Sequence, residues 1–105
     1  MLHIDESQSG SEIELRTGEP LEIRLSENPT TGFRWSLESS GAPACILVED
    51  VYETSPVTPG AGGNHRWRFQ AAQIGEGRIR LGYRRSWEGQ GAASRTFTLG
   101  VRVVK

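Results

Sequence analysis

The side chains best suited to chemistry in this chain are one cysteine, two histidines and a pair of adjacent carboxylates. Cys45 and either His65 or His3 would supply a thiol nucleophile and its base if the fold brought them together. Glu49 and Asp50 are neighbours, and neighbouring side chains on a strand face opposite sides, so they do not form a paired acid and base. One cysteine and two histidines are too few for a structural zinc site. Because no acid, base and nucleophile can be assembled, we expect a binding protein without a cofactor rather than an enzyme.

The first of three segments suited to binding combines a proline, two hydroxyl side chains and a glycine. It reads Asn28-Pro29-Thr30-Thr31-Gly32-Phe33. Pro29 fixes its own φ, and Gly32 permits a positive φ or a close backbone approach. Asn-Pro and Thr-Gly pairs are also common in plain β-turns, so this segment by itself predicts only a turn.

The second segment is rich in glycine and runs over residues 56–64, with Pro59-Gly60-Ala61-Gly62-Gly63 at its centre. It lacks the Gly-Lys-Ser/Thr ending and the following helix of a phosphate-binding loop. Its glycines leave backbone N–H and C=O groups unshielded, so the segment can pair with the extended backbone of a partner. A flexible hairpin tip is the alternative interpretation.

The third segment places an aromatic side chain among arginine and glycine, as Arg84-Arg85-Ser86-Trp87-Glu88-Gly89. Trp87 follows a predicted strand, and tryptophan beside arginine is the composition of an interface hot spot. The alternative is a tryptophan that folds back over the end of the molecule.

The elements that must hold these segments are strands, because apolar and polar residues alternate along most of the chain. Seven such runs are present, and Leu2–Ile4 is a possible short eighth strand. Each run has one apolar face, which we expect on a core, and one polar face in water. Turn-forming clusters separate the runs; they include Gly75-Glu76-Gly77. The runs lie at residues 13–15, 21–25, 33–37, 46–52, 67–71, 79–83 and 97–103.

This pattern predicts an all-β fold, an immunoglobulin-like antiparallel β-sandwich of seven to eight strands, with a small barrel as the alternative. Cys45 opens the fourth run next to Ile46 and Leu47, and we expect its side chain to be buried as a small hydrophobe. Thirteen glycines in 105 residues disfavour a helical bundle.

Length and charge limit the partners. A chain of 105 residues is the size of one domain, and we expect a single domain over residues 1–105 that is monomeric when free. A net charge of -1 gives no electrostatic footprint for nucleic acid. The charge is uneven, since residues 1–53 hold three arginines and eleven acids, and residues 54–105 hold eight arginines, one lysine and two acids. The two halves could attract each other within the fold or present a surface to a charged partner. An ordinary solvated surface is the interpretation that we favour for most of these charges.

The N-terminal residues Met1–Glu6 have neither the basic region nor the apolar segment of a signal peptide. No apolar stretch is long enough for a transmembrane helix. We therefore expect a cytoplasmic protein, or a mature form whose signal has been removed, with no membrane partner.

Taken together, the three segments resemble the chagasin family of inhibitors of papain-like cysteine peptidases. The family pattern is Asn-Pro-Thr-Thr-Gly-Tyr/Phe, then Gly-x-Gly-Gly, then Arg-Pro-Trp/Phe. The first two motifs are intact at residues 28–33 and 60–63, and the third reads Arg85-Ser86-Trp87, with serine in place of the family's proline. Order and spacing match over essentially the whole chain.

The resemblance implies an immunoglobulin-like sandwich whose three loops form a wedge that enters the active-site cleft of a papain-like cysteine peptidase and binds reversibly. Residues 28–32 would take the centre, with Thr31 close to the catalytic cysteine of the peptidase. Residues 60–63 would lie along one side through main-chain hydrogen bonds, and Arg85 and Trp87 along the other. An immunoglobulin-like binding or adhesion module for another protein or a carbohydrate is the alternative. The residues expected to bind the peptidase are Asn28, Pro29, Thr30, Thr31, Gly32, Phe33, Gly60, Ala61, Gly62, Gly63, Arg85, Ser86 and Trp87.

Overall fold

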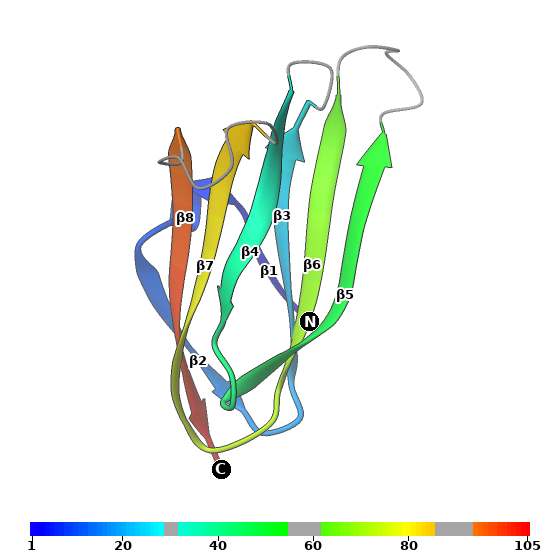
Figure 1. Cartoon of the computed structure of the whole chain (residues 1–105). Coiled ribbons are helices and arrows are strands. Elements are labelled where there is room, and N and C mark those ends of the chain that lie inside the picture. Colours follow the sequence, from blue (N-terminus) through cyan, green and yellow to red (C-terminus); the bar gives the residue numbers. More distant parts are fainter. Residues whose placement is uncertain (29–31, 55–61, 86–93) are drawn as a thin grey trace.

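The computed structural model describes residues 1–28, 32–54, 62–85 and 94–105, which form two four-stranded sheets packed face to face (Figure 1). The first sheet has the strand order β1-β3-β6-β5, and the second has the order β2-β8-β7-β4. This arrangement confirms the predicted β-sandwich and includes the short first strand. The elements in chain order are β1 (Leu2–Ile4), the 3-10 helix η1 (Glu6–Gln8), β2 (Ser11–Arg16), β3 (Pro20–Glu27), β4 (Phe33–Ser40), β5 (Cys45–Thr54), β6 (Gly63–Ala71), β7 (Gly75–Arg85) and β8 (Arg95–Val104).

Four of the six strand pairings are antiparallel, as predicted, and two pairings at sheet edges are parallel. β1 runs parallel to β3, and β2 runs parallel to β8. The chain passes from one sheet to the other after β1 and returns after β2, reversing its direction each time (Figure 1). The first and third strands therefore share a sheet and a direction. None of the helices among the described residues is long or apolar enough to cross a membrane.

The core between the sheets consists of the inward positions of the alternating runs. Its most deeply buried members come from β3, β6, β7 and β8, which are the inner strands of the two sheets. Burying one side chain of this size contributes roughly 1.5–3 kcal/mol. Cys45 is fully buried among them, as predicted. The largest fully buried side chains include Trp67, Phe69, Phe97, Leu21, Ile23, Leu25, Ile79, Leu81 and Leu99.

Two local expectations are wrong. The cluster Gly75–Gly77 is not a turn, because β7 begins at Gly75 and the chain turns just before it. Gly77 is nevertheless required, since an added Cβ would collide with the carbonyl oxygen of Gly41. On β5, Ile46 and Val48 are 47% and 55% exposed rather than turned to the core. β5 is an edge strand whose register with β6 shifts between Leu47 and Glu49, which interrupts the alternation.

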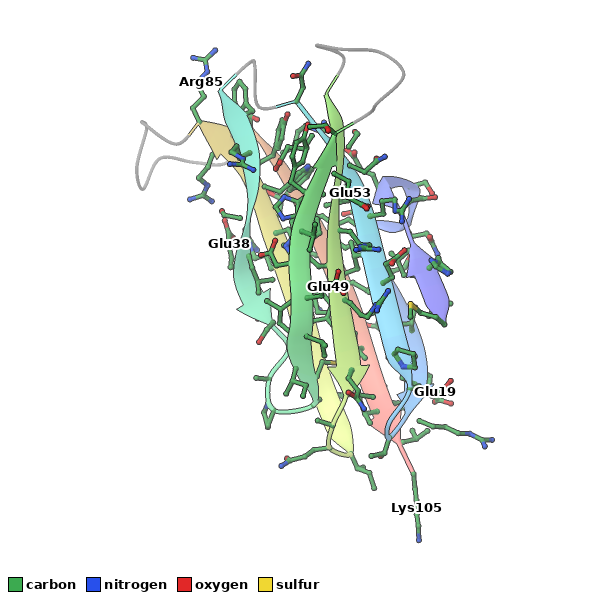
Figure 2. All side chains as sticks on the ribbon, turned by 90° about the vertical axis from the view of Figure 1, so that its right-hand side faces the viewer. Glu19, Glu38, Glu49, Glu53, Arg85 and Lys105 are labelled. Atoms are coloured by element: carbon green, nitrogen blue, oxygen red, sulfur yellow. The ribbon has the colours of Figure 1, made fainter. Side chains whose placement is uncertain are left out.

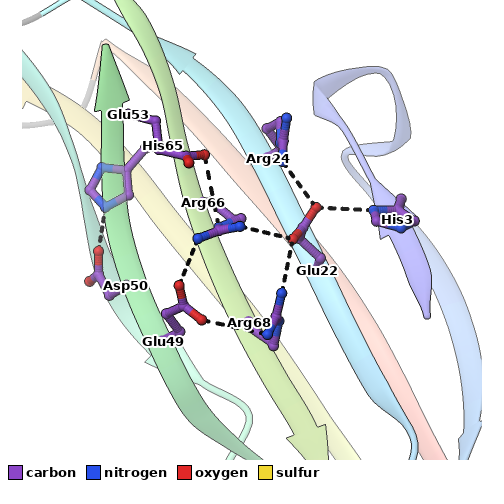
Figure 3. A network of polar contacts seen from close by, with 9 residues as sticks. All are labelled: His3, Glu22, Arg24, Glu49, Asp50, Glu53, His65, Arg66 and Arg68. Carbon is purple, nitrogen blue, oxygen red and sulfur yellow. Dashed lines mark hydrogen bonds and ion pairs between the residues drawn. The ribbon is translucent and has the colours of Figure 1, made fainter.

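The uneven charge is used within the fold, where ion pairs join the two halves of the sequence. Arginines from the second half pair with acids from the first half on the outer faces of both sheets, and Figure 3 shows the pairs on the first sheet. Glu22 is 4% exposed although it lies on an outer face, because three arginines and His3 surround its carboxylate. Among the described residues, the arginine–acid pairs that join the halves are Arg66–Glu22, Arg66–Glu49, Arg66–Glu53, Arg68–Glu22, Arg68–Glu49, Arg80–Glu38, Arg84–Glu38 and Arg95–Glu6.

Candidate functional site

The described flanks of all three candidate loops lie at one end of the sandwich. β3, β5 and β7 end there, and β4, β6 and β8 begin there (Figure 1). Figure 2 places Arg85 at this end, whereas Glu19 and Lys105 lie at the opposite end. Segments that are about 30 residues apart in the sequence thus share one surface. We call this surface the loop end; its described members are Asn28, Gly32, Phe33, Thr54, Gly62, Gly63, Arg85 and Ser94.

Six of the thirteen predicted binding residues belong to the described part of the chain, and the structure brings all six to the loop end. They are Asn28, Gly32, Phe33, Gly62, Gly63 and Arg85. The other seven lie outside the described residues, so their roles stay predictions: Pro29, Thr30, Thr31, Gly60, Ala61, Ser86 and Trp87.

The first and second loops meet at their bases, and the meeting requires glycine. The register of β3 and β6 pairs Glu27 with Gly63. Gly62 has a φ of +83°, and a Cβ added there would lie 2.7 Å from the carbonyl oxygen of Glu27 and 2.9 Å from Cβ of Asn28. A Cβ at Gly63 would collide with the carbonyl group of Glu53. These two glycines therefore have a packing role in addition to any contact with a partner.

The first and third loops meet through side chains. Phe33 and Arg85 are paired across β4 and β7, and the guanidinium carbon of Arg85 lies 4.8 Å from the centroid of the Phe33 ring. Phe33 stacks on Tyr83 with ring centroids 5.3 Å apart, and Tyr83 in turn lies 4.8 Å from the ring of Trp35. Such cation–π contacts are worth about 0.5–1 kcal/mol at an exposed site. These contacts connect the base of the first loop to the base of the third loop.

Beneath the loop end lies a charged cluster with a buried centre that the sequence patterns did not identify. Glu27 is 2% exposed, and its Oε1 accepts a hydrogen bond from the backbone N–H of Trp35 at 2.5 Å. Nδ1 of His65 lies 3.2 Å from the same oxygen, and Nε of Arg34 lies 3.5 Å from Oε2. The second ring nitrogen of His65 pairs with Asp50 (Figure 3).

A signal for this cluster was present in the sequence. On β3, Glu27 occupies the next core-facing position after Leu21, Ile23 and Leu25. His65 continues the inward period of Trp67 and Phe69 on its neighbour, and its ring stacks on Trp67 with centroids 4.0 Å apart. An acid and a base at core-facing positions of two strands indicate a buried pair.

Electrostatics favours the charged forms of this pair. Burial acts to raise the pKa of the Glu27 carboxyl, but hydrogen bonds from His65 and from the Trp35 N–H outweigh it, with help from the charges of His65 and Arg34. The pKa of Glu27 is therefore lowered. Burial acts to lower the pKa of His65, but hydrogen bonds and attraction to Glu27 and Asp50 outweigh it, so that pKa is raised. In its protonated form the imidazole has an N–H for each of the two carboxylates.

The residues considered for catalysis are not brought together. Cys45 pairs with Ala71 at one end of the β5–β6 ladder, and His65 pairs with Tyr52 near the other end. Burial also raises the pKa of the Cys45 thiol, which disfavours the nucleophilic thiolate. Within the described ranges, no group of three His, Cys, Asp or Glu side chains could hold a metal ion.

His3 and the adjacent carboxylates have structural partners instead. His3 lies 3.0 Å from Glu22, and Glu49 lies 2.7 Å from Arg66. Asp50 belongs to the cluster with His65. These side chains stabilise the outer sheet face and the base of the loop end.

The described residues form a β-sandwich that brings the flanks of three candidate loops to one end. The chain belongs to the chagasin family of peptidase inhibitors, whose family model matches residues 14–101. The chain is 35% identical to amoebiasin-1 of Entamoeba histolytica over 102 residues, which cover 97% of this chain and 99% of the relative. It is 31% identical to chagasin of Trypanosoma cruzi over 101 residues, 91% of this chain and 92% of the relative.

A solved structure has the same fold as this chain. A cysteine protease inhibitor from Entamoeba histolytica superposes with a TM-score of 0.84 at 21% identity, over 98% of this chain and 94% of that chain. Family membership accounts for the three motifs together and establishes an inhibitor rather than an enzyme. It does not favour the alternative of an adhesion module.

Proposed function

We propose that this protein inhibits papain-like cysteine peptidases by inserting the loop end of its sandwich into the active-site cleft. The observation that carries this proposal is the convergence of the described flanks of all three motif-bearing segments on one end of the sandwich. Asn28 packs against Gly62, and Phe33 pairs with Arg85. Because strands anchor both flanks of every loop, the described loop bases have little conformational entropy to lose on binding. Inhibition is reversible and requires no covalent bond.

Within this proposal each loop has its own role. Residues 28–32 occupy the centre of the cleft, with Thr31 next to the catalytic cysteine of the peptidase. Residues 60–63 pair through their backbone along one side of the cleft. Arg85 and Trp87 contact the other side, where the indole packs on aromatic surface. Family membership and the placement of the described flanks support these roles.

The direct test is a titration of a papain-like peptidase with the purified protein. We expect turnover to fall to zero near one equivalent and the inhibitor to be recovered uncut. A serine peptidase assayed in parallel should be unaffected. Cleavage within residues 28–33 together with recovery of activity would show that the protein is a substrate and would overturn the proposal.

A variant at the third loop tests the binding mode. Trp87→Ala should weaken inhibition by about 2 kcal/mol or more, as for an interface anchor. Ile74→Ala is the matched control, because Ile74 is 66% exposed in the connection between β6 and β7, which lies at the opposite end of the sandwich (Figure 1). An inhibition constant that is unchanged in both variants would assign Trp87 a purely structural role.

A further inference from the structure

The buried cluster under the loop end is an uncommon solution for a small core. Glu27 and His65 occupy inward positions that their strands otherwise fill with leucine, isoleucine, tryptophan and phenylalanine. Burying charges is costly, and well-packed apolar residues of similar volume are often as stable or more stable. Stability alone therefore does not explain a carboxylate at this position.

The contacts of Glu27 give a better explanation for a carboxylate at this buried position. Glu27 is the last residue of β3, immediately before the first loop, and the N–H that it accepts belongs to Trp35 on the strand that leaves the same loop. One carboxylate thus closes the base of the first loop. The same carboxylate meets His65, which follows Gly63 by two residues at the base of the second loop.

Further contacts connect β5, the strand that enters the second loop, to Glu27 and His65. The hydroxyl of Tyr52 on β5 donates to the backbone carbonyl of Glu27 at 3.4 Å, and Asp50 on β5 pairs with the far nitrogen of His65. Gly62 packs against the same carbonyl of Glu27. Four strands that flank the first two loops therefore converge on one residue.

We propose that Glu27 is a positioning residue for peptidase binding, whose carboxylate holds the first and second loops in the relative arrangement that fits the cleft. The inference rests on the proposed function, because it concerns the same binding surface. Glu27 itself has no contact with the peptidase in this scheme. It acts through Trp35 and His65.

The ionisation of the pair gives this role a pH dependence. The ionisable and charged groups that face the pair are Arg34 on β4 and Asp50 and Tyr52 on β5. A pocket of about 200 Å³ lies beside Glu27, and it is also lined by Tyr83 on β7 and Arg95 on β8. Since the pKa of Glu27 is lowered, its contribution is complete above the unperturbed value of 4.5 and is lost as the pH falls through the folded-state value.

The contribution of His65 has the opposite sign. Its pKa is raised, so its contribution is complete below the unperturbed value of 6.5 and is lost as the pH rises through the folded-state value. The ion pair is therefore fully formed between pH 4.5 and 6.5 and weakens on the alkaline side.

The experiment compares Glu27→Gln with Glu22→Gln. Glutamine at position 27 keeps an acceptor for the Trp35 N–H and removes the charge. Glu22 is a matched control, since it lies on the same strand, is 4% exposed and is also ion-paired, but it faces the outer side of the sheet away from the loop end (Figure 3). Inhibition constants against a papain-like peptidase and thermal stability are measured for both variants and the parent.

We expect both variants to lose stability and only Glu27→Gln to lose affinity, by about tenfold at pH 5.5. The ratio of the Glu27→Gln and parent inhibition constants cancels the pH dependence of the peptidase itself. This ratio should be largest between pH 4.5 and 6.5 and should fall towards higher pH as His65 is deprotonated in the parent. A purely structural role would lower the affinity of both variants alike and would leave the ratio independent of pH.

The possible failures are distinguishable. If the parent protein does not inhibit the peptidase, the proposed function is wrong before any variant is compared. If the parent inhibits and Glu27→Gln has the parent's inhibition constant at every pH, only the positioning role of Glu27 is overturned. Should Glu27→Gln fail to fold, His65→Gln removes the same ion pair, and its ratio to the parent is expected to show the same decline with pH; a flat ratio overturns the inference.

Discussion

Replacing Gly62 with alanine probes the packing between the bases of the first and second loops. The residue has a φ of +83°, and its missing Cβ would lie 2.7 Å from the carbonyl oxygen of Glu27, where ordinary contacts begin at 3.4 Å. The neighbouring backbone must therefore shift by several tenths of an ångström. Because that carbonyl directly precedes Asn28, the shift is transmitted to the first loop.

The loss of stability expected for Gly62→Ala has two contributions. A left-handed conformation costs a residue with a Cβ about 1–2 kcal/mol. Forcing an extra methyl group into a packed site costs about 1–3 kcal/mol more. We therefore expect Gly62→Ala to lower the free energy of unfolding by about 2–5 kcal/mol.

Gly18→Ala measures the first contribution alone, so the difference between Gly62→Ala and Gly18→Ala isolates the second. Gly18 has a φ of +93°, but nothing lies within 4 Å of a Cβ built there. It lies in the turn between β2 and β3, at the end opposite the loops, and should cost only about 1–2 kcal/mol. The effect of alanine on the unfolded chain is common to both variants and cancels in their difference.

The assay is urea denaturation of both variants, together with their inhibition constants against a papain-like peptidase. Gly62→Ala should be less stable than Gly18→Ala by about 1–3 kcal/mol and should be the weaker inhibitor. Equal losses of stability, with equal inhibition constants, would refute the idea that the two loop bases are packed against each other through Gly62.

Two further predictions concern the core and the exposed edge. Cys45 should react with a thiol reagent only after denaturation, because its side chain is fully buried and burial raises its pKa; rapid labelling of the native protein, followed by absorbance, would contradict this. Val48→Lys should change the free energy of unfolding by no more than about 0.5 kcal/mol, because Val48 is 55% exposed, whereas Leu81→Ala should cost about 2–5 kcal/mol because Leu81 is fully buried. Chemical denaturation of the two variants checks this contrast, and comparable losses would contradict it.

The strand pattern could be predicted from the sequence because most strands have one face on the core. Alternation at Trp67 and Phe69 or at Ile79 and Leu81 reports that burial directly. It fails on β5, where Ile46 and Val48 lie on an edge strand with a shifted register and are not held against the core. The parallel edge pairings could not be read from alternation, since a strand's own pattern is the same in either direction.

The candidate site was predictable to a different degree. The order of the motifs predicted that the three segments lie close together in the fold. The pairing of Phe33 in the first segment with Arg85 in the third is consistent with this prediction. The role of Glu27 was not predicted, because alternation indicates only that Glu27 lies on the core-facing side of its strand and does not identify its partner. Its partner His65 lies 38 positions further along the chain, and only the pairing of β3 with β6 brings them together.

The parallel pairing of β2 with β8 has a consequence for how the molecule is made. All four strands of the first sheet are complete once residue 71 has been synthesised. The second sheet must wait for residues 95–104, because β8 lies between β2 and β7 and is the only partner of β2 in the described part of the chain. Until then the apolar face of the first sheet has no complete cover. Folding is therefore expected to finish late, after the C-terminal strand has left the ribosome, and nascent chains that stall before β8 should be prone to aggregation.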